Sequence, residues 1–388
     1  MTYYIGIDIA KFSHDCFITT ETGEVIVEHL SFNNDKEGFN KLLHLLKSLD
    51  NVSEIRIGFE ATGHYGINLK LFLEKHNYSF MEFNALLIKR FTTTTTLRRT
   101  KTDKIDTKDI ASYLMTKDYI PNPSKFYHKF SLKQLTRLRE NLVKNQSKYK
   151  VNLTNILDRT FPEFKPFFKN NFSATSLYIL NKYKTSGKIA NMKDYDSLRK
   201  ISRGKFSSTK FIKLKELAKN TIGNSNEMNT LELDCVLTLL KAINDEINKL
   251  DSEIETIIKE LNPPTLTIKG IGITMCAAII AEFGDVNRFN SPDAMLAYAG
   301  LEPSIIQSGM MEFKGKMVKH GSGHLRYHLM NAAMYVMIHE PIFSSYYYKK
   351  RDEGKPHRVA LSHLAKKLIR VIYKLETDNI TFESSKLN

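Results

Sequence analysis

Residues 3–9 read YYIGIDI, and this stretch is the starting point for assigning the fold. Its β-branched and aromatic residues predict a buried strand. Asp8 is the exception, because a carboxylate between two isoleucines is costly to bury unless it is paired or bound to a cation. We therefore expect a core strand that holds an acidic residue for a chemical purpose.

The residues that follow alternate between strand and helix patterns up to residue 84. Short turns after the first strand predict an antiparallel meander of three strands. The predicted elements are strands at 3–9, 14–20, 25–27, 55–60 and 78–83, and helices at 39–49 and 67–74. Three strands, helix, strand, helix, strand is the order of an α/β ribonuclease-H-like fold. We expect this domain to occupy residues 1–120.

The charge and cysteine content narrow the class of protein. The 57 lysines and arginines exceed the 42 acidic residues by 15, which points to a polyanionic partner such as nucleic acid. Residues 313–374 alone carry 13 basic against three acidic residues. Three widely spaced cysteines argue against a disulfide framework or a four-cysteine zinc site. No signal peptide and no apolar run of about 18 residues is present, so we expect a cytosolic protein that does not enter a membrane.

Four acidic residues are the candidates for metal chemistry. Asp8 and Glu60 lie in the first and fourth predicted strands, which are adjacent in a ribonuclease-H-like sheet, while Asp103 and Asp106 begin a predicted helix. An oxygen-only ligand set from three elements suits Mg²⁺. Each acid taken alone could instead form a salt bridge or cap a helix. Actin-like sugar kinases also open with IGID, but their glycine–threonine phosphate loop is missing after Asp8.

A basic stretch separates this domain from two long helices. Residues 88–108 contain seven lysines and arginines and five consecutive threonines, which predicts a flexible loop that contacts phosphates. We expect Arg98, Arg99, Lys101 and Lys104 to bind nucleic acid there. A helix then resumes from Ile105.

Two heptad-like patterns occupy residues 132–157 and 236–261, and Pro263-Pro264 ends the second. These patterns predict a coiled-coil-like linking domain over residues 121–264. The two helices either pack on each other within one chain or form a subunit interface. The basic insertion at 165–230 is rich in Lys, Asn, Ser and Phe and suggests no function by itself.

Residues 265–388 predict a mostly helical domain. IKGIGI at 268–273 is typical of a helix-hairpin-helix turn, whose glycines let the backbone approach a phosphate, or of a plain turn between packed helices. A polar, glycine-rich passage between helices follows at 299–326, with Ser308 as a candidate nucleophile. The further candidate contacts to nucleic acid are Lys269, Gly270, Gly272, Lys314, Lys316, Lys319 and Arg326.

Taken in order, these motifs resemble the DEDD-type transposases of insertion sequences, a family of bridge-RNA-guided serine recombinases. The N-terminal motifs are YIGIDIAK with Asp8, FEATGHY with Glu60, and KTDKIDTKDIA with Asp103 and Asp106. The later motifs are IKGIG, AGLEP, QSG with Ser308, and KHGSGHLR. One departure is the stretch between the two helical patterns, which is longer than in a typical member.

The resemblance implies a mechanism and partners. A RuvC-type domain would bind Mg²⁺ through Asp8, Glu60, Asp103 and Asp106, and Ser308 from another subunit would attack the scissile phosphate and become linked to DNA. It further implies a structured bridge RNA that pairs with element ends and target DNA, a homodimer or homotetramer, and a place in the bacterial cytosol at the nucleoid. Two other functions remain open: a metal-dependent junction resolvase or nuclease that needs no serine, and a non-catalytic nucleic-acid-binding protein.

Overall fold

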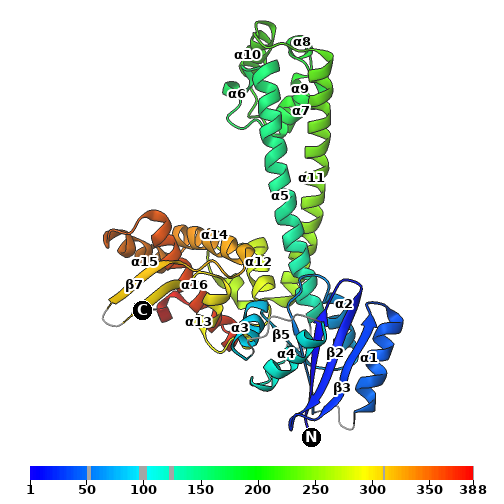
Figure 1. The fold of residues 1–388 in the computed structure, drawn as a ribbon. Helices are drawn as coiled ribbons and strands as arrows, with labels where there is room; N and C mark the ends of the chain where they lie inside the picture. The colour runs from blue at the N-terminus through cyan, green and yellow to red at the C-terminus, as the bar shows by residue number, and fades with distance from the viewer. Residues whose placement is uncertain (50–53, 96–102, 122–125, 309–310, 388) are drawn as a thin grey trace. The chain divides into compact units, whose positions relative to one another are not determined.

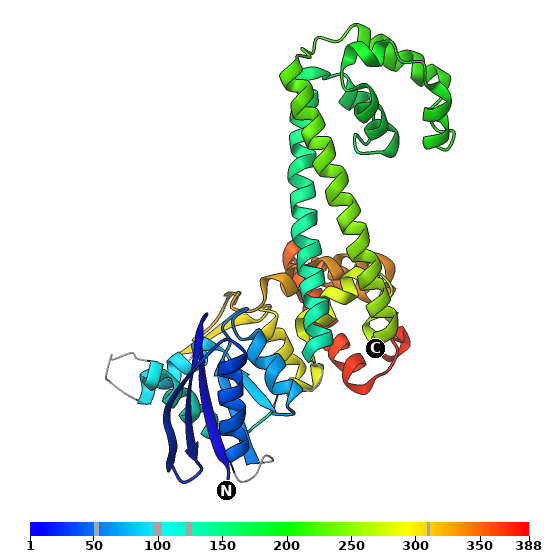
Figure 2. The ribbon, with the colours of Figure 1, turned by 90° about the vertical axis from the view of Figure 1, so that its right-hand side faces the viewer.

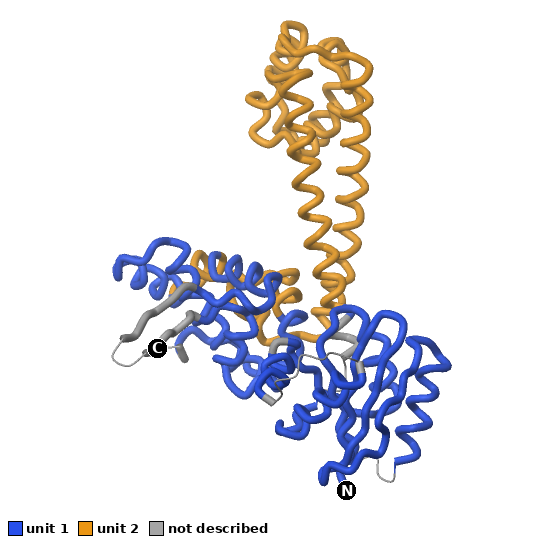
Figure 3. Tube along the Cα trace, in the orientation of Figure 1, with its two compact units in different colours: residues 1–131, 280–334, 342–388 blue, residues 132–279, 335–341 orange. Residues whose placement is uncertain are grey.

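The computed structural model describes residues 1–49, 54–95, 103–121, 126–308 and 311–387 (Figure 1). The chain forms two compact units (Figure 3). One comprises residues 1–131, 280–334 and 342–388, and the other comprises residues 132–279 and 335–341.

A five-stranded sheet forms the centre of the N-terminal part, with strand order β3-β2-β1-β4-β5. The strands are β1 (Tyr3–Ile9), β2 (Ser13–Thr20), β3 (Val25–Asn33), β4 (Ile55–Glu60) and β5 (Phe80–Phe83). β1, β2 and β3 pair antiparallel, whereas β4 pairs parallel with both β1 and β5. The predicted mixed α/β sheet is therefore confirmed. β3 is longer than predicted, because this edge strand is mostly exposed and its polar residues hide the strand pattern.

Helices cover both faces of this sheet. On one face, α1 (Lys36–Ser48) and α2 (Ile67–Lys75) share an apolar core with alternate residues of β1 and β4, such as Ile5 and Ile57. On the other face, α4 (Asp103–Met115) and α3 (Ala85–Thr95) pack with Tyr4 and Phe83. Residues that alternate along a strand point to opposite faces, so the strand pattern sets which helix each residue meets.

Gly6 fixes how closely α4 approaches the sheet. A Cβ at this position would lie 2.2 Å from the carbonyl oxygen of Thr107 and 2.7 Å from the backbone nitrogen of Ala111. Only glycine leaves room for the helix backbone there. The predicted helix after the basic stretch is thus confirmed, and it begins at Asp103, two residues earlier than expected.

The predicted loop at 88–108 is wrong over residues 88–95, which belong to helix α3. Buried Ile88 anchors this helix. The threonine hydroxyls bond back to helix carbonyls, as Thr92 Oγ1 does to Ile88 O at 3.1 Å and Thr94 Oγ1 to Phe91 O at 2.8 Å. These bonds satisfy the side chains that made the stretch look like a poor helix. Arg98, Arg99 and Lys101 lie outside the described residues.

Two helices of 35 residues each, α5 (Phe126–Thr160) and α11 (Glu227–Leu261), run side by side in the second unit (Figures 1 and 2). Arg139 pairs with Asp251, and Gln146 donates to Asn244. Of the two alternatives that the sequence left open, packing within one chain is therefore confirmed. Whether the pair also forms a subunit interface stays a prediction.

The insertion between these helices is a folded helical cap, which we define as residues 164–219. Its helices are α6 (Phe164–Phe167), α7 (Ala174–Tyr183), α8 (Ser186–Ala190), α9 (Tyr195–Ile201) and α10 (Ser208–Lys219). Phe164, Leu198 and Leu214 are buried in a core that also contains Leu157 of α5 and Leu237 of α11. The cap is thus anchored where α5 ends and α11 begins.

The rest of the chain is mostly helical, as predicted. Its helices are η2 (Pro264–Thr267), α12 (Ile273–Phe283), η3 (Val286–Arg288), α13 (Pro292–Tyr298), α14 (Gly323–His339), α15 (Pro341–Asp352), α16 (His357–Asp378) and η4 (Ser384–Leu387). The passage predicted as irregular contains an antiparallel pair instead, β6 (Pro303–Ser308) and β7 (Met311–Met317). No helix among the described residues is long and apolar enough to cross a membrane.

Candidate active site

Asp8 and Glu60 occupy equivalent places on the two central strands. Ile7 of β1 is in register with Phe59 of β4, so each acid is the next residue on a parallel neighbour. Both face the same side of the sheet, because each follows by two positions one of the paired glycines Gly6 and Gly58. Both side chains are half-buried. The expected adjacency of the first and fourth strands is confirmed.

Helix α4 covers the face of the sheet on which both acids lie. Gly6 meets α4 at Thr107 and Ala111, and its partner Gly58 meets the later residue Leu114. The helix therefore crosses from β1 toward β4, and its first turn carries Asp103 and Asp106. A helix N-terminus favours negative charge, since the unpaired backbone N–H groups point toward it.

The side chains are only partly defined at this site. Asp106 is half-buried, and the side chain of Asp103 lies outside the described residues. Among the side chains that the structure describes, no three His, Cys, Asp or Glu are close enough together to hold a metal ion. The topology thus places Asp8 and Glu60 side by side on the face that α4 covers, and the proposed metal site stays a prediction.

A fifth acid, Asp15, belongs to this face and was missed from the sequence. Asp15 of β2 is the direct cross-strand neighbour of Asp8 and is only 8% exposed. His29 Nε2 of β3 lies 2.9 Å from its Oδ1. The signal was present, because an acid directly before the apolar run Cys16-Phe17-Ile18 is the same kind of anomaly that singled out Asp8.

Contacts of α4 with β3 and α3 shift the pKa values of two further acids, Glu28 and Asp109. Lys104 pairs with Glu28 of β3 at 2.7 Å, and this bond lowers the pKa of the Glu28 carboxyl. Asp109, one turn further along, has its pKa raised, chiefly by burial, while a hydrogen bond with Thr92 of α3 opposes this shift. Lys104, predicted to bind nucleic acid, is exposed and pairs with a carboxylate in this structure.

The candidate nucleophile lies in the C-terminal part. Ser308 is the last residue of β6 and is in register with Met311 of β7. Its side chain is outside the described atoms, so its role stays a prediction. Another serine nearby in sequence, Ser322, is engaged in structure: it donates to Glu282 at 3.0 Å and accepts from the backbone N–H of Leu325 at 3.2 Å.

The other residues predicted to contact nucleic acid differ in their exposure and packing. Gly270 has φ +99°, and a Cβ there would lie 2.8 Å from the Tyr335 carbonyl oxygen, which favours a turn packed on α14. Lys269 and Lys319 are exposed. Arg326 is half-buried, and its buried Nη1 has no hydrogen-bond partner among the residues that the structure describes. Gly272 has open space where a Cβ would be. The side chains of Lys314 and Lys316 lie outside the description.

Two family models match the chain. Residues 5–162 match a model described as a transposase, the DEDD domain of IS110 elements, and this match contains Asp8, Glu60, Asp103 and Asp106. Residues 265–348 match the model described as the transposase IS116/IS110/IS902 family, and this match contains Ser308.

Proteins of three insertion elements are similar to the chain. A Streptomyces coelicolor protein named provisionally as the mini-circle transposase for IS117 is 24% identical over 400 residues, covering 95% of this chain and 92% of the relative. The IS116 44.8 kDa protein of Streptomyces clavuligerus is 21% identical over 98% of this chain and 96% of its own length. The IS110 43.6 kDa protein of Streptomyces coelicolor is 26% identical over 147 residues, 37% of this chain and 36% of that protein.

The two matched regions and the mixed α/β sheet with its acids define the class of protein: it is an insertion-sequence transposase. The chain belongs to the IS110/IS116 family of transposases, and it aligns with two of the relatives over nearly its whole length.

Proposed function

We propose that this transposase cuts and rejoins DNA at the ends of its insertion element through a covalent link between Ser308 and DNA. The acids Asp8, Glu60, Asp103 and Asp106 would hold the divalent cation, Mg²⁺, that assists the reaction. One observation carries the proposal: Asp8 and Glu60 lie side by side near the ends of two neighbouring parallel strands, on the face of the sheet that α4 covers.

The residues present suit a hard cation. All four ligands offer carboxylate oxygens, which Mg²⁺ prefers over nitrogen or sulfur. The close packing at Gly6 supports the same conclusion, because it lets the first turn of α4 approach the strand that carries Asp8. When bound, the cation would supply Lewis-acid stabilisation of negative charge on a phosphodiester. The protein's contribution is to hold several carboxylates together that would otherwise repel one another.

Ser308 would supply the nucleophile. Its Oγ forms a bond to the scissile phosphorus while the bond from phosphorus to one deoxyribose oxygen breaks. The serine proton is balanced by protonation of the leaving oxygen, so no oxidant, reductant or nucleotide triphosphate is consumed. The phosphodiester energy is kept in the serine ester, and attack by a second DNA strand's hydroxyl regenerates the free serine.

We further propose that a structured bridge RNA selects the DNA and that the active form is a homodimer or homotetramer in which Ser308 acts at the acidic site of another subunit. The resemblance of the motif set to bridge-RNA-guided recombinases supports both statements. Pairing between nucleic acids would supply sequence choice, leaving the protein to recognise backbone shape and charge.

Trapping tests this proposal. The protein, purified with its copurifying RNA, is incubated with Mg²⁺ and end-labelled DNA that is nicked so that rejoining is prevented, and the products are run on a denaturing gel. We expect a protein-linked band whose DNA-modified peptide contains Ser308. A modified peptide from elsewhere in the chain would overturn the assignment of the nucleophile. DNA cleaved without any protein link would instead support a nuclease that uses water.

A further inference from the structure

The helical cap carries one of the two large concentrations of positive charge in the chain, the other being residues 313–374. Residues 164–219 contain 14 lysines and arginines and three acids, a net charge of +11, which leaves +4 for the other 332 residues. Neither family model covers this region, because one match ends at residue 162 and the other begins at 265. No function is therefore assigned to the most basic part of the molecule.

The charge lies on the surface of the cap. Twelve of the 14 basic side chains are exposed. Among the described residues, Lys182 pairs with Asp194 and Lys184 with Asp234, and no other basic residue of the cap forms an ion pair. The twelve that lack one are Lys165, Lys169, Lys188, Lys193, Arg199, Lys200, Arg203, Lys205, Lys210, Lys213, Lys215 and Lys219.

The basic residues are most closely spaced from the end of α9 through α10. Residues 199–219 include eight basic residues and one acid, Glu216. The turn between these helices places Arg203 at φ +53° and Gly204 at φ +79°. An arginine in the left-handed region costs about 1 kcal/mol. A long cationic side chain thus occupies a position where its backbone is strained.

Folding does not require this charge. The cap packs around an apolar core shared with α5 and α11, to which it contributes Ile179, Leu198, Phe206 and Leu214. Its short helices include ones that begin with serine caps, as at Ser173 and Ser207. Like charges on one small domain repel and lower its stability. A surface that is unfavourable for the isolated domain is explained by a partner of opposite charge.

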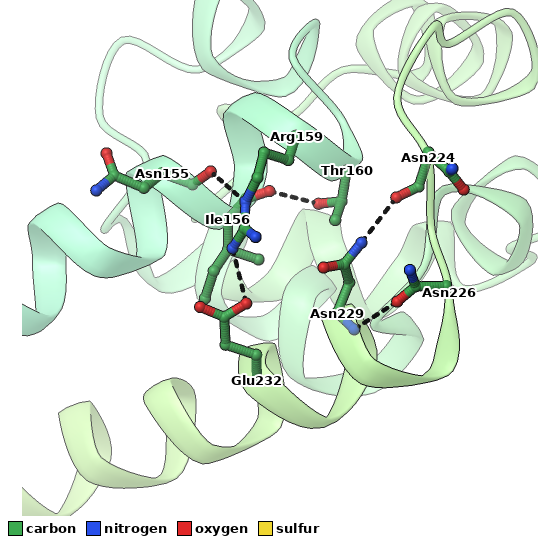
Figure 4. A network of polar contacts seen from close by, with 8 residues as sticks. All are labelled: Asn155, Ile156, Arg159, Thr160, Asn224, Asn226, Asn229 and Glu232. Atoms are coloured by element: carbon green, nitrogen blue, oxygen red, sulfur yellow. Dashed lines mark hydrogen bonds and ion pairs between the residues drawn. The ribbon is translucent and has the colours of Figure 1, made fainter.

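The cap is joined to the helical hairpin by a shared apolar core and by Lys184, which pairs with Asp234 of α11 at 2.8 Å. The ends of the hairpin beside the cap are also held together. Figure 4 shows the junction, where Arg159 of α5 pairs with Glu232 of α11 at 2.7 Å and Asn229 bonds the backbone oxygen of Asn224 at 3.0 Å. The returning chain also packs tightly, since a Cβ on Gly223 would lie 2.3 Å from the Thr160 carbonyl oxygen. A binding surface that is already ordered in the free protein loses less conformational entropy when its partner binds.

We propose that the helical cap is an additional DNA-binding surface, which contacts the phosphates of duplex DNA through Arg199, Lys200, Lys205 and Lys213 without reading its sequence. DNA is the polyanion on which a transposase acts, and dense exposed lysine and arginine is the surface that phosphate contacts require. The cap thereby holds DNA outside the two regions that the family models describe.

The test uses the full chain with a 40-base-pair DNA duplex of random sequence and, in parallel, an RNA duplex of the same length. Binding is followed by fluorescence anisotropy from low to high salt. The variant is Arg199→Gln, Lys200→Gln, Lys205→Gln and Lys213→Gln combined. The matched control neutralises four exposed lysines of the hairpin: Lys148→Gln, Lys241→Gln, Lys249→Gln and Lys259→Gln. Each lost phosphate contact reduces the slope of log affinity against log salt by about 0.9. We expect the cap variant to lose roughly 3 to 4 from this slope and at least about tenfold in affinity, and the control to lose much less.

Three outcomes would overturn the proposal: unchanged DNA affinity of the cap variant, an equal loss in the hairpin control, or a loss confined to an RNA duplex of the same length. A second variant, Arg199→Lys, Lys200→Arg, Lys205→Arg and Lys213→Arg, keeps the charge and should bind like the wild type. Weak DNA binding by this charge-preserving variant would show that the lost binding reflects a damaged fold, and would also overturn the proposal.

Discussion

Asp8 of β1 lies directly opposite Asp15 of β2, and His29 of β3 holds Asp15 at 2.9 Å. Two carboxylates on facing positions of an antiparallel pair destabilise a sheet unless positive charge lies near them. His29 can supply part of that charge when protonated, and a bound cation would supply more. Asp15 therefore extends the proposed metal site from β1 and β4 to the antiparallel side of the sheet.

We expect Asp15→Asn to weaken divalent-ion binding about tenfold. One unit charge some 6 Å from a divalent ion contributes about 1.4 kcal/mol in a water-like dielectric, and the substitution removes that charge while keeping the side chain's shape. Titration of the full chain with Mn²⁺, followed by electron paramagnetic resonance, measures the free ion. Glu54→Gln, an acid at the opposite end of β4 that pairs with the N-terminus, is the control. Equal affinities for the two variants would place Asp15 outside the site.

Glu60→Gln should abolish Mg²⁺-dependent cleavage of element-end DNA and leave DNA binding unchanged. The amide keeps the size of the side chain at the end of β4 but loses the charge that a cation needs. A cleavage assay on labelled DNA, with and without EDTA, gives the comparison. Cleavage that persists in this variant, or in EDTA with the wild type, contradicts the metal-dependent mechanism.

We predict that Gly6→Ala separates α4 from the sheet and lowers the free energy of unfolding by about 2–4 kcal/mol, in the range of overpacked cores. The added Cβ would meet the backbone of Thr107 at 2.2 Å, and backbone cannot rotate away as a side chain can. Chemical denaturation of the full chain measures the change. Gly187→Ala in α8, where a Cβ would meet nothing within 4 Å, should be neutral or slightly stabilising. Similar stabilities for the two variants would mean that α4 does not depend on Gly6.

The sequence predicted the central sheet well and its surroundings less well. Alternating and β-branched residues defined β1, β2 and β4, since buried strands have a strong pattern. β3 was cut short because an exposed edge strand lacks that pattern. α3 was taken for a loop, because hydrogen bonds from threonine hydroxyls to the preceding helical turn cannot be seen in composition.

Only part of the candidate site could be predicted, because some of its neighbours depend on strand register and on packing between distant segments. Asp8 and Glu60 could be placed together, because strand order in this fold makes their strands neighbours. Asp15 was missed, since its closeness to Asp8 depends on the register of β1 with β2. The helical cap was seen only as a basic insertion, because its core is shared with the ends of α5 and α11, which are far apart in sequence.

Ser308→Ala should eliminate the covalent protein–DNA adduct and preserve DNA binding. Removal of the hydroxyl removes the only atom of that side chain able to bond phosphorus. Ser304→Ala, at another position of the same strand β6, is the matched control and should form the adduct normally. Both variants are compared on a denaturing gel and in a binding assay. An adduct of undiminished yield in the Ser308 variant would move the nucleophile to another residue.

Glu163 lies at the junction of the cap with the hairpin, between the end of α5 and the start of the cap. Glu163 accepts hydrogen bonds from Thr221 Oγ1 at 2.5 Å and from the backbone N–H of Ile222 at 3.1 Å. Burial raises the pKa of the Glu163 carboxyl, but these hydrogen bonds outweigh it, so the pKa falls below 4.5. The stabilisation is therefore complete above pH 4.5 and is lost as the pH falls through the lower folded-state value.

We expect Glu163→Gln to increase amide hydrogen exchange of residues 220–226 severalfold at neutral pH, because a neutral amide is a weaker acceptor than a carboxylate. The difference between variant and wild type should shrink as the pH is lowered through the folded-state pKa of Glu163, because the wild-type carboxyl then also becomes neutral. Exchange is measured by mass spectrometry. Comparing the two proteins at the same pH removes the intrinsic pH dependence of exchange, which is equal in both. Glu216→Gln, an exposed acid of α10, should behave as the wild type throughout. A difference that stays constant with pH would show that Glu163 stabilises the junction by its shape and not by its charge.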